Sequence, residues 1–431
     1  MPGSENVTGW TTLQYQLDNN TRSKEALTKL DSRQGWIVTV ASLAILSMAL
    51  GAPYVTIVAL KAIAADFGGF RSTPSAAASL AMLGTGVGGL GMGWLAERIG
   101  VKRVVCLGAC MVCAGLALSS LGEVWQLYVG HGLLIGLLGN GAINAPLYVY
   151  VTRWFEARRG AALALLSGGQ YVAGASLPPL FERAIAIYGW RQTMFSYGLV
   201  VAAVVVPLAL LFLQPAPETA RAGGAAQAGA QREQVFGLPS NLAFALLAGA
   251  AFLCCVPMAM PASHLIALCG DLGFAPGRGP VMLTVLLVSA FLSRQFWGWI
   301  TDRVGGLKTV LVGSLAQATA ISGFIVTQNE MGLLAVAAAF GLGFSGLIPA
   351  YIVAIRQLFP AHEASWRIPT LLLTGMSGMA AGSWLAGRLY DYFGFYAPAF
   401  ATGLFFNLVN TALVAGLLLL WRRSQARVAF S

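Results

Sequence analysis

The sequence predicts an all-α membrane protein with twelve transmembrane helices in two pseudo-symmetric six-helix halves. Of its 431 residues, 57% are hydrophobic and only 10% are charged, and its mean hydropathy is +0.72. A soluble domain carries about a quarter of its residues charged. Apolar runs long enough to cross about 30 Å of hydrocarbon recur along the chain. The loop at 93–103 returns at 298–308, 205 residues later, which is typical of two membrane halves that share one ancestor.

Six apolar runs precede a polar linker and six follow it. We expect the first six helices near 36–60, 74–95, 104–121, 126–152, 160–181 and 192–213. We expect the second six near 241–268, 279–300, 308–327, 331–358, 367–389 and 397–421. The runs define an N-terminal tail (1–35), an N-terminal bundle (36–213), a linker (214–240), a C-terminal bundle (241–421) and a C-terminal tail (422–431). The first tail is polar and mixed in charge, so it does not form a cleavable signal peptide.

The basic residues orient the predicted helices. With both termini in the cytoplasm, 19 of the 26 Lys and Arg residues lie on the cytoplasmic side, 4 in the N-terminal tail, 3 in the C-terminal tail and 12 in loops. This asymmetry follows the positive-inside rule. It predicts a multi-pass protein of the inner (plasma) membrane with both termini cytoplasmic. The net charge of +10 therefore reports topology, and nucleic acid is not an expected partner.

The repeated loop suggests a gate. Each copy joins one apolar run to the next through a tight basic turn and places an acid, Glu97 or Asp302, at a helix end. Such an acid can pair with a helix N-terminus or a basic side chain and so close the cytoplasmic side in one state. The alternative is a solvated charge run that only fixes topology. The candidate gating residues are Gly93, Glu97, Arg98, Gly100, Lys102, Arg103, Gly298, Asp302 and Arg303.

Proline interrupts the backbone hydrogen bonds at corresponding places in both halves. Pro53 in the first expected helix lies 204 residues before Pro257 in the seventh. Broken helices at equivalent positions indicate a transport cavity, although proline kinks are also ordinary in membrane helices. Cys106, Cys110 and Cys113 share one helix face, and we expect them to pack against neighbours and not to bind a metal.

Several segments resemble known transporters. The repeated loop resembles the G-x-x-x-[DE]-R-x-G-x-[KR]-[KR] loop between the second and third helices of the major facilitator superfamily. Residues 153–160 (RWFEARRG) and 387–396 (GRLYDYFGFY) are similar to patterns of its monocarboxylate-transporter and oxalate–formate-antiporter branch. The resemblance covers nearly the whole chain. It implies the major facilitator fold and secondary transport.

Arg294 is the only charged side chain that we place deep within an expected helix. It lies eight residues before Asp302, about 12 Å into helix eight. Arg at a helix centre costs about 2.5–3.5 kcal/mol even on lenient insertion scales, so it is a functional candidate. The resemblance places a substrate-binding arginine here, which can hold a carboxylate through two hydrogen bonds. The alternative is an arginine that snorkels to the cytoplasmic interface.

The chain also departs from that branch. Tyr54 stands where many monocarboxylate transporters have Lys, and Ala290 stands where they often have Asp. The antiporter has a second cation in helix eleven, and residues 368–387 contain none. One cation neutralises one carboxylate, so a monoanion is favoured over oxalate. The polar side chains that could line the substrate site, or only join helices, are Tyr54, Asn140, Asn144, Tyr148, Gln170, Tyr171, His264 and Tyr351.

Together these features predict a monomeric secondary transporter that moves a small organic anion, a monocarboxylate, through the lipid bilayer by alternating access. The alternatives are an exporter of amphipathic drugs or metabolites and a transporter-like membrane sensor. The chain has no H-E-x-x-H and no G-x-x-x-x-G-K-[ST], so we expect neither enzyme activity nor a cofactor. Every Asp and Glu falls in a tail, loop or helix end, so we expect no carboxylate to carry a proton. His131 and His264 are the only intramembrane side chains that titrate near neutrality.

Overall fold

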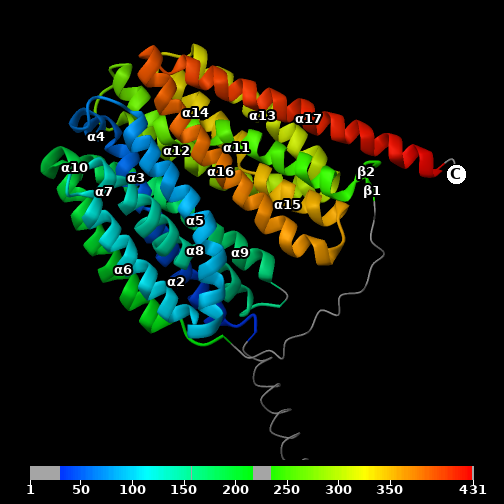
Figure 1. The fold of residues 1–431 in the computed structure, drawn as a ribbon, viewed down its shortest axis with the longest axis horizontal. Coiled ribbons are helices and arrows are strands. Elements are labelled where there is room, and N and C mark those ends of the chain that lie inside the picture. Colours follow the sequence, from blue (N-terminus) through cyan, green and yellow to red (C-terminus); the bar gives the residue numbers. More distant parts are fainter. Residues whose placement is uncertain (1–29, 157, 217–233, 430–431) are drawn as a thin grey trace, which may run out of the picture.

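The computed structural model describes residues 30–156, 158–216 and 234–429 and has two helical bundles (Figure 1). The N-terminal half contains α2 (Arg33–Leu50), α3 (Ala52–Val58), α4 (Leu60–Asp66), α5 (Ser72–Ile99), α6 (Val101–Ser119), α7 (Val124–Val129), the π-helix η1 (Gly130–Asn140), α8 (Gly141–Thr152), α9 (Arg159–Ser167) and α10 (Gly169–Phe212). The C-terminal half begins with an antiparallel hairpin of β1 (Gln234–Val235) and β2 (Leu238–Pro239). It continues with α11 (Ser240–Asp271), α12 (Arg278–Val304), α13 (Gly306–Val326), α14 (Glu330–Phe344), α15 (Leu347–Leu358), α16 (Ala361–Phe393) and α17 (Ala397–Ala429).

The prediction of twelve membrane helices is confirmed. Among the described residues, ten segments are long and apolar enough to cross a membrane. One of them, Arg159–Phe212, holds two helices, because Gly189 has φ 78° and ψ 164° and turns the chain between them. α16 adds another, since its 33 residues pack between α11 and α5 although it carries charges near both ends. The tail up to residue 29 and the linker at 217–233 lie outside the described residues, so the division into domains stays a prediction.

Side-chain caps explain where two of the helices begin. The Ser32 hydroxyl accepts a hydrogen bond from the backbone N–H of Gly35 at 3.3 Å. The Asn329 side chain accepts one from the N–H of Gly332 at 2.7 Å. Each cap satisfies a donor that the first helical turn leaves without a partner, so α2 and α14 begin at the residues that follow.

Glycines allow the helices within each half to pack at backbone distance. A Cβ at Gly84 or Gly88 of α5 would collide with the backbone of η1, and a Cβ at Gly382 of α16 would collide with that of Val256 in α11. Small residues at such contacts let membrane helices associate through close packing. These glycines therefore serve packing.

The two halves interrupt their helices at only some equivalent places. The fourth membrane helix changes from η1 to α8 after Asn140, and the tenth breaks after Phe344, 204 residues later. The paired proline kinks are less symmetric. Helix one is interrupted at Gly51, and Pro53 then occupies the first turn of α3, where a missing N–H costs little. α11 instead continues unbroken across Pro257.

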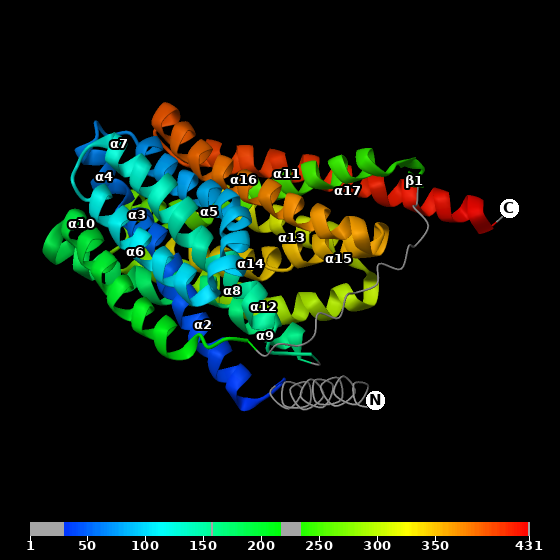
Figure 2. The same cartoon turned by 60° about the horizontal axis from the view of Figure 1, so that its bottom comes forward.

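The halves lie side by side with their helices running between two ends (Figure 2). We call the end where α5 and α12 finish, at Ile99 and Val304, the motif end. We call the end where these helices begin, at Ser72 and Arg278, the far end. The repeated loops lie at the motif end. Polar contacts between the halves are concentrated toward the far end, as described below.

Candidate functional site

The two halves meet along a seam between α10 and α12 that ends at Arg294. Leu287 of α12 lies against Gly174 of α10, and Phe291 lies against Gly168, where a Cβ would come within 2.8 Å of the Phe291 ring. Leu287, Phe291 and Arg294 lie four and three positions apart along α12, so they share one face of this helix. The seam positions Arg294, one turn beyond Phe291, next to Tyr171 of α10.

Arg294 contacts the opposite half through Tyr171. Its Nη1 donates a hydrogen bond to the Tyr171 hydroxyl at 3.1 Å, and its guanidinium carbon lies 5.8 Å from the centre of that ring. Arg294 is partly buried and, within the described part of the chain, no Asp or Glu forms an ion pair with it. Its other N–H donors make no hydrogen bond there either. The guanidinium is therefore free to bind an anion.

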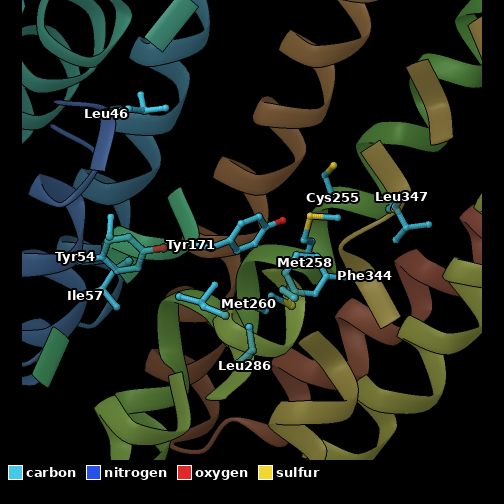
Figure 3. Close-up of a cluster of buried hydrophobic side chains, with 14 of the residues drawn as sticks. Leu46, Tyr54, Ile57, Tyr171, Cys255, Met258, Met260, Leu286, Phe344 and Leu347 are labelled. Atoms are coloured by element: carbon cyan, nitrogen blue, oxygen red, sulfur yellow. The ribbon is translucent and has the colours of Figure 1, made fainter. Parts of the chain in front are cut away.

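Two further tyrosines of the N-terminal half lie close to this pair. Tyr148 of α8 lies near both Arg294 and Tyr171. Tyr54 of α3 lies near Tyr171, and its hydroxyl is packed against Gly174. Figure 3 shows Tyr54 and Tyr171 among apolar side chains of the other half, including Met258, Met260 and Leu286. The structure thus brings Arg294, Tyr171, Tyr148 and Tyr54 together in an aromatic environment.

The other candidates of the N-terminal half are not hydrogen-bonded to Arg294. Asn140 ends η1 and is 1% exposed, and within the described part of the chain its Oδ1 has no hydrogen-bond partner. Asn144 is partly buried in α8, and Gln170 is exposed in α10. None of these side chains has a described hydrogen bond, so their place in the substrate site stays a prediction.

Tyr351 lies in a polar network inside the C-terminal half. It is 0% exposed, and its hydroxyl donates to Asn410 Oδ1 at 2.8 Å, while Asn410 Nδ2 donates to Ser314 at 2.8 Å. These bonds join α13, α15 and α17 of one bundle. In this conformation Tyr351 therefore joins helices and does not contact Arg294. His264 also lies elsewhere, at the far end.

At the far end an arginine that the sequence did not single out joins the two halves. Arg71, just before α5, donates through Nη1 and Nη2 to both carboxylate oxygens of Asp271 in α11, and through Nη1 to the Tyr396 hydroxyl at 2.9 Å. Lys61 pairs with the same carboxylate at 3.0 Å, and the Arg71 guanidinium lies 3.5 Å over the Tyr390 ring. Burial alone would lower the pKa of Arg71, but the bonds to Asp271 and Tyr396 raise it, so the cation stays charged.

Asp391 of α16 also binds the start of α5 at the far end. Its carboxylate accepts the backbone N–H groups of Arg71 at 2.7 Å and Ser72 at 3.0 Å, and so caps the start of α5 from the other half. We call Arg71, Asp271, Asp391 and Tyr396 the far-end latch. The sequence signal was available, because Asp391 and Tyr396 belong to the pattern at 387–396. Its partner in the other half could not be identified from that pattern.

The two repeated loops have matching geometry at the motif end. Gly100 has φ 89° and Gly305 has φ 87°, values that favour glycine, and each precedes the next helix. Arg98 stacks on Trp94 at 3.8 Å, and Arg303 stacks on Trp299 at 3.9 Å. The remaining glycines of the motif, Gly93 and Gly298, face open space. The duplication in sequence therefore extends to backbone and side-chain conformation.

The charged partners of the two loops differ. Glu97 pairs with Arg153 of its own half at 3.5 Å, and Lys102 donates to the Leu210 carbonyl at 2.8 Å. Asp302 forms no ion pair within the described residues, and Arg103 forms none there either. In this conformation the motif acids do not join the halves, so the gating role stays a prediction. On the motif side of Arg294, no hydrogen bond or ion pair between described residues connects the two halves.

A second arginine, Arg367, is buried near the start of a membrane helix. Arg367 is the seventh residue of α16 and is 1% exposed. It pairs with Glu363 at 2.7 Å and donates to Asn241 at 3.0 Å. The helix begins six residues before the expected boundary, so Arg367 lies in its second turn and not at its first residue. Because Arg367 is fully paired, its place indicates a structural role, unlike Arg294.

Comparison with known proteins agrees with this architecture. The sequence model of the Major Facilitator Superfamily matches residues 35–293. Monocarboxylate transporter 13 of Rattus norvegicus is 25% identical over 74% of each chain, and monocarboxylate transporter 4 of the same organism is 24% identical over 84% of this chain and 78% of its own. An uncharacterised MFS-type transporter of Bacillus subtilis is 24% identical over 80% and 81%.

Solved structures share the fold at lower identity. The peptide transporter POT, crystallised with sulfate, superposes with a TM-score of 0.69 at 16% identity over 92% of this chain and 99% of its own. The nucleoside transporter NupG gives 0.69 at 12% identity over 89% and 100%. At these identities the likeness concerns the fold alone.

Proposed function

Because the chain belongs to the Major Facilitator Superfamily, we propose that it carries a small organic anion, a monocarboxylate, across the plasma membrane by alternating access. The observation that carries the proposal is the unpaired guanidinium of Arg294 at the junction of the halves. A planar guanidinium matches a carboxylate through two parallel hydrogen bonds. The named monocarboxylate transporters among the relatives support the same substrate class.

Tyr171 adds a second contact for the substrate. In the described structure its oxygen accepts from Arg294, and its own O–H proton has no acceptor. A tyrosine hydroxyl can accept and donate at once, whereas a carboxylate only accepts. A bound carboxylate would therefore receive two hydrogen bonds from Arg294 of the C-terminal half and one from Tyr171 of the N-terminal half. Binding would hold the halves together at this depth, as alternating access requires.

One cation in the site favours one negative charge on the substrate. Arg71 and Arg367 are occupied by Asp271 and Glu363, so Arg294 is the arginine available for the substrate. A second carboxylate would lie among tyrosine and apolar side chains without a cation, and an unpaired buried charge is costly. The site therefore suits a monocarboxylate better than a dicarboxylate.

The excess of Lys and Arg places the motif end in the cytoplasm under the positive-inside rule. The latched far end then faces outward, and the conformation described here is the inward-facing one. To change state, the protein breaks the far-end latch and brings the motif end of the two halves together. Substrate at Arg294 passes from one side to the other without leaving its site.

Uptake by proteoliposomes tests this function. Purified protein is reconstituted and challenged with labelled lactate, pyruvate, acetate, formate, oxalate and phenylacetate. We expect saturable uptake of at least one monocarboxylate and weaker uptake of oxalate. If no carboxylate is taken up while an amphipathic drug is transported, the anion proposal is wrong and the exporter alternative replaces it.

A further inference from the structure

His264 is a buried titratable side chain that the substrate site does not use. It lies in α11, is 0% exposed, and contacts both halves. Its Nε2 is 2.9 Å from the Ser383 carbonyl and 3.4 Å from the Ser75 hydroxyl, and its Nδ1 is 3.0 Å from the Tyr396 hydroxyl. Because Ser75 belongs to α5, separation of the halves at the far end would uncover the imidazole.

The partners of His264 fix its protonation state in this conformation. The Ser383 carbonyl can only accept, so Nε2 carries a proton and donates to it. Arg71 donates to the Tyr396 oxygen, and the Tyr396 O–H is then directed to Nδ1 of His264. In this arrangement Nδ1 is the unprotonated acceptor. The hydrogen bonds run in one direction, from Arg71 through Tyr396 to a neutral His264.

A proton on Nδ1 would disrupt this order. Nδ1 would become a donor, the Tyr396 proton would lose its acceptor, and two cations would face one hydroxyl. Asp271 is already paired with Arg71 and Lys61. Asp391 would favour a charged imidazole, but its carboxylate accepts two backbone N–H groups of α5 and forms no described hydrogen bond with the ring. The charged and titratable groups around His264, from all elements packed against it, are Arg71, Lys61, Asp271, Tyr390, Asp391 and Tyr396.

We infer that His264 is a proton-binding site that controls the far-end latch. The proton binds Nδ1 when the far end is open and water reaches the ring, and it must leave before the latch re-forms. Acid therefore favours the open far end, and proton binding is linked to the conformational step. This gives the transporter a route to proton coupling through an imidazole, although it has no carboxylate in the substrate site.

The size of the effect follows from linkage. One coupled proton shifts an equilibrium by up to about tenfold per pH unit. If the open state has an ordinary exposed imidazole with a pKa of about 6.5 and the latched state binds no proton, acidification from pH 8 to 5.5 raises the open-to-latched ratio by about tenfold. The ratio rises on acidification because the open state binds more protons than the latched state.

Distance measurements between spin labels can detect this shift without any substrate. The labels are placed on cysteines at Ile187 and Met331 (Ile187→Cys, Met331→Cys), which are 71% and 74% exposed at the far end of opposite halves. The native cysteines of α6 are first replaced by alanine, because the other three are buried. The full-length protein in lipid nanodiscs is measured at pH 8 and pH 5.5. We expect a longer-distance population to grow at pH 5.5.

Two matched histidine variants decide the assignment. His264→Gln keeps a neutral donor and acceptor but cannot bind the proton, so the acid response should disappear. His131 is equally buried, but its partners Thr56, Ser119 and the Leu127 carbonyl all belong to the N-terminal half. His131→Gln should keep the full response. Asp271→Asn, which weakens the latch directly, should show the longer distance at both pH values.

The inference is overturned if the acid response persists in His264→Gln, which would assign it to the carboxylates, or if it is equally lost in His131→Gln. A flat response in the otherwise unchanged labelled protein, with Asp271→Asn showing the longer distance, would also overturn it. A second neutral variant, His264→Asn, serves if His264→Gln does not fold. Because no substrate is added, the result is independent of the proposed anion.

Discussion

The far-end latch makes a quantitative prediction for Asp271→Asn. The carboxylate accepts both terminal nitrogens of Arg71 and also pairs with Lys61. The Arg71 side chain is 9% exposed and that of Asp271 is 23% exposed, so the pair is only lightly screened by solvent. Lys61 is 48% exposed, and its pair contributes little. Hydrogen bonds to charged groups contribute about 1.5–3 kcal/mol.

Arg71 keeps some of its partners in the variant, which limits the loss. The Tyr396 hydroxyl and the Tyr390 ring still contact the guanidinium. We therefore expect the latched state to lose about 2 kcal/mol relative to the open state, which is an approximately 30-fold change in their ratio. The same spin-label pair at Ile187 and Met331 reports the ratio at neutral pH.

Glu182→Gln is the matched control. Glu182 also contacts the opposite half at the far end. Among the described residues its side chain accepts only the backbone N–H of Gly277, at 3.0 Å, and a glutamine oxygen can replace it. We expect its distance distribution to match that of the labelled protein without either substitution. If Asp271→Asn also leaves the distribution unchanged, the latch does not set the conformational balance and this reasoning is refuted.

Three further predictions concern stability and are read from thermal unfolding in detergent. Gly305→Ala places a side chain on a residue with φ 87° and ψ 158°, which should lower the free energy of unfolding by about 1–3 kcal/mol. Gly298 lies inside α12 with open space around it, so Gly298→Ala should leave the free energy of unfolding unchanged or raise it by up to about 1 kcal/mol. Equal effects of the two substitutions would contradict the backbone argument. Arg367→Ala leaves Glu363 without its buried partner and should cost about 3–5 kcal/mol. Arg294→Gln breaks no ion pair and should cost less than about 1 kcal/mol, and a large loss would indicate a structural role.

The helices were predictable because a membrane imposes a simple rule on sequence. An apolar run of about twenty residues must form a helix that satisfies its own backbone. The expected span at 279–300 accordingly matches α12, Arg278–Val304. The difference at the start of α16, six residues before the expected boundary, has a physical cause. Glu363 and Arg367 lower the local hydropathy, but they neutralise each other within the helix.

The contacts between halves could not be predicted from the sequence. Arg71 and Asp271 are 200 residues apart, and only the docking of two folded bundles brings them together. The same holds for Arg294 and Tyr171, although each was a candidate by itself. For Arg294 the signal was local, since a charge within an apolar run is costly to insert into a membrane and therefore indicates a functional residue. For Arg71, which lies in an expected loop, no such signal existed.

The most direct test of the central claim is counterflow of labelled pyruvate by Arg294 variants in proteoliposomes. Loss of the charged carboxylate contact, about 2–3 kcal/mol, predicts approximately 30- to 150-fold weaker exchange for Arg294→Gln. Arg294→Lys should also be poor, because an ammonium lacks the planar fork. Arg278→Gln, which removes an exposed arginine from the same helix, should exchange normally. We expect this pattern for pyruvate, or for whichever monocarboxylate the uptake screen identifies. Near-normal exchange by folded Arg294→Gln would contradict the role of Arg294 as the carboxylate anchor.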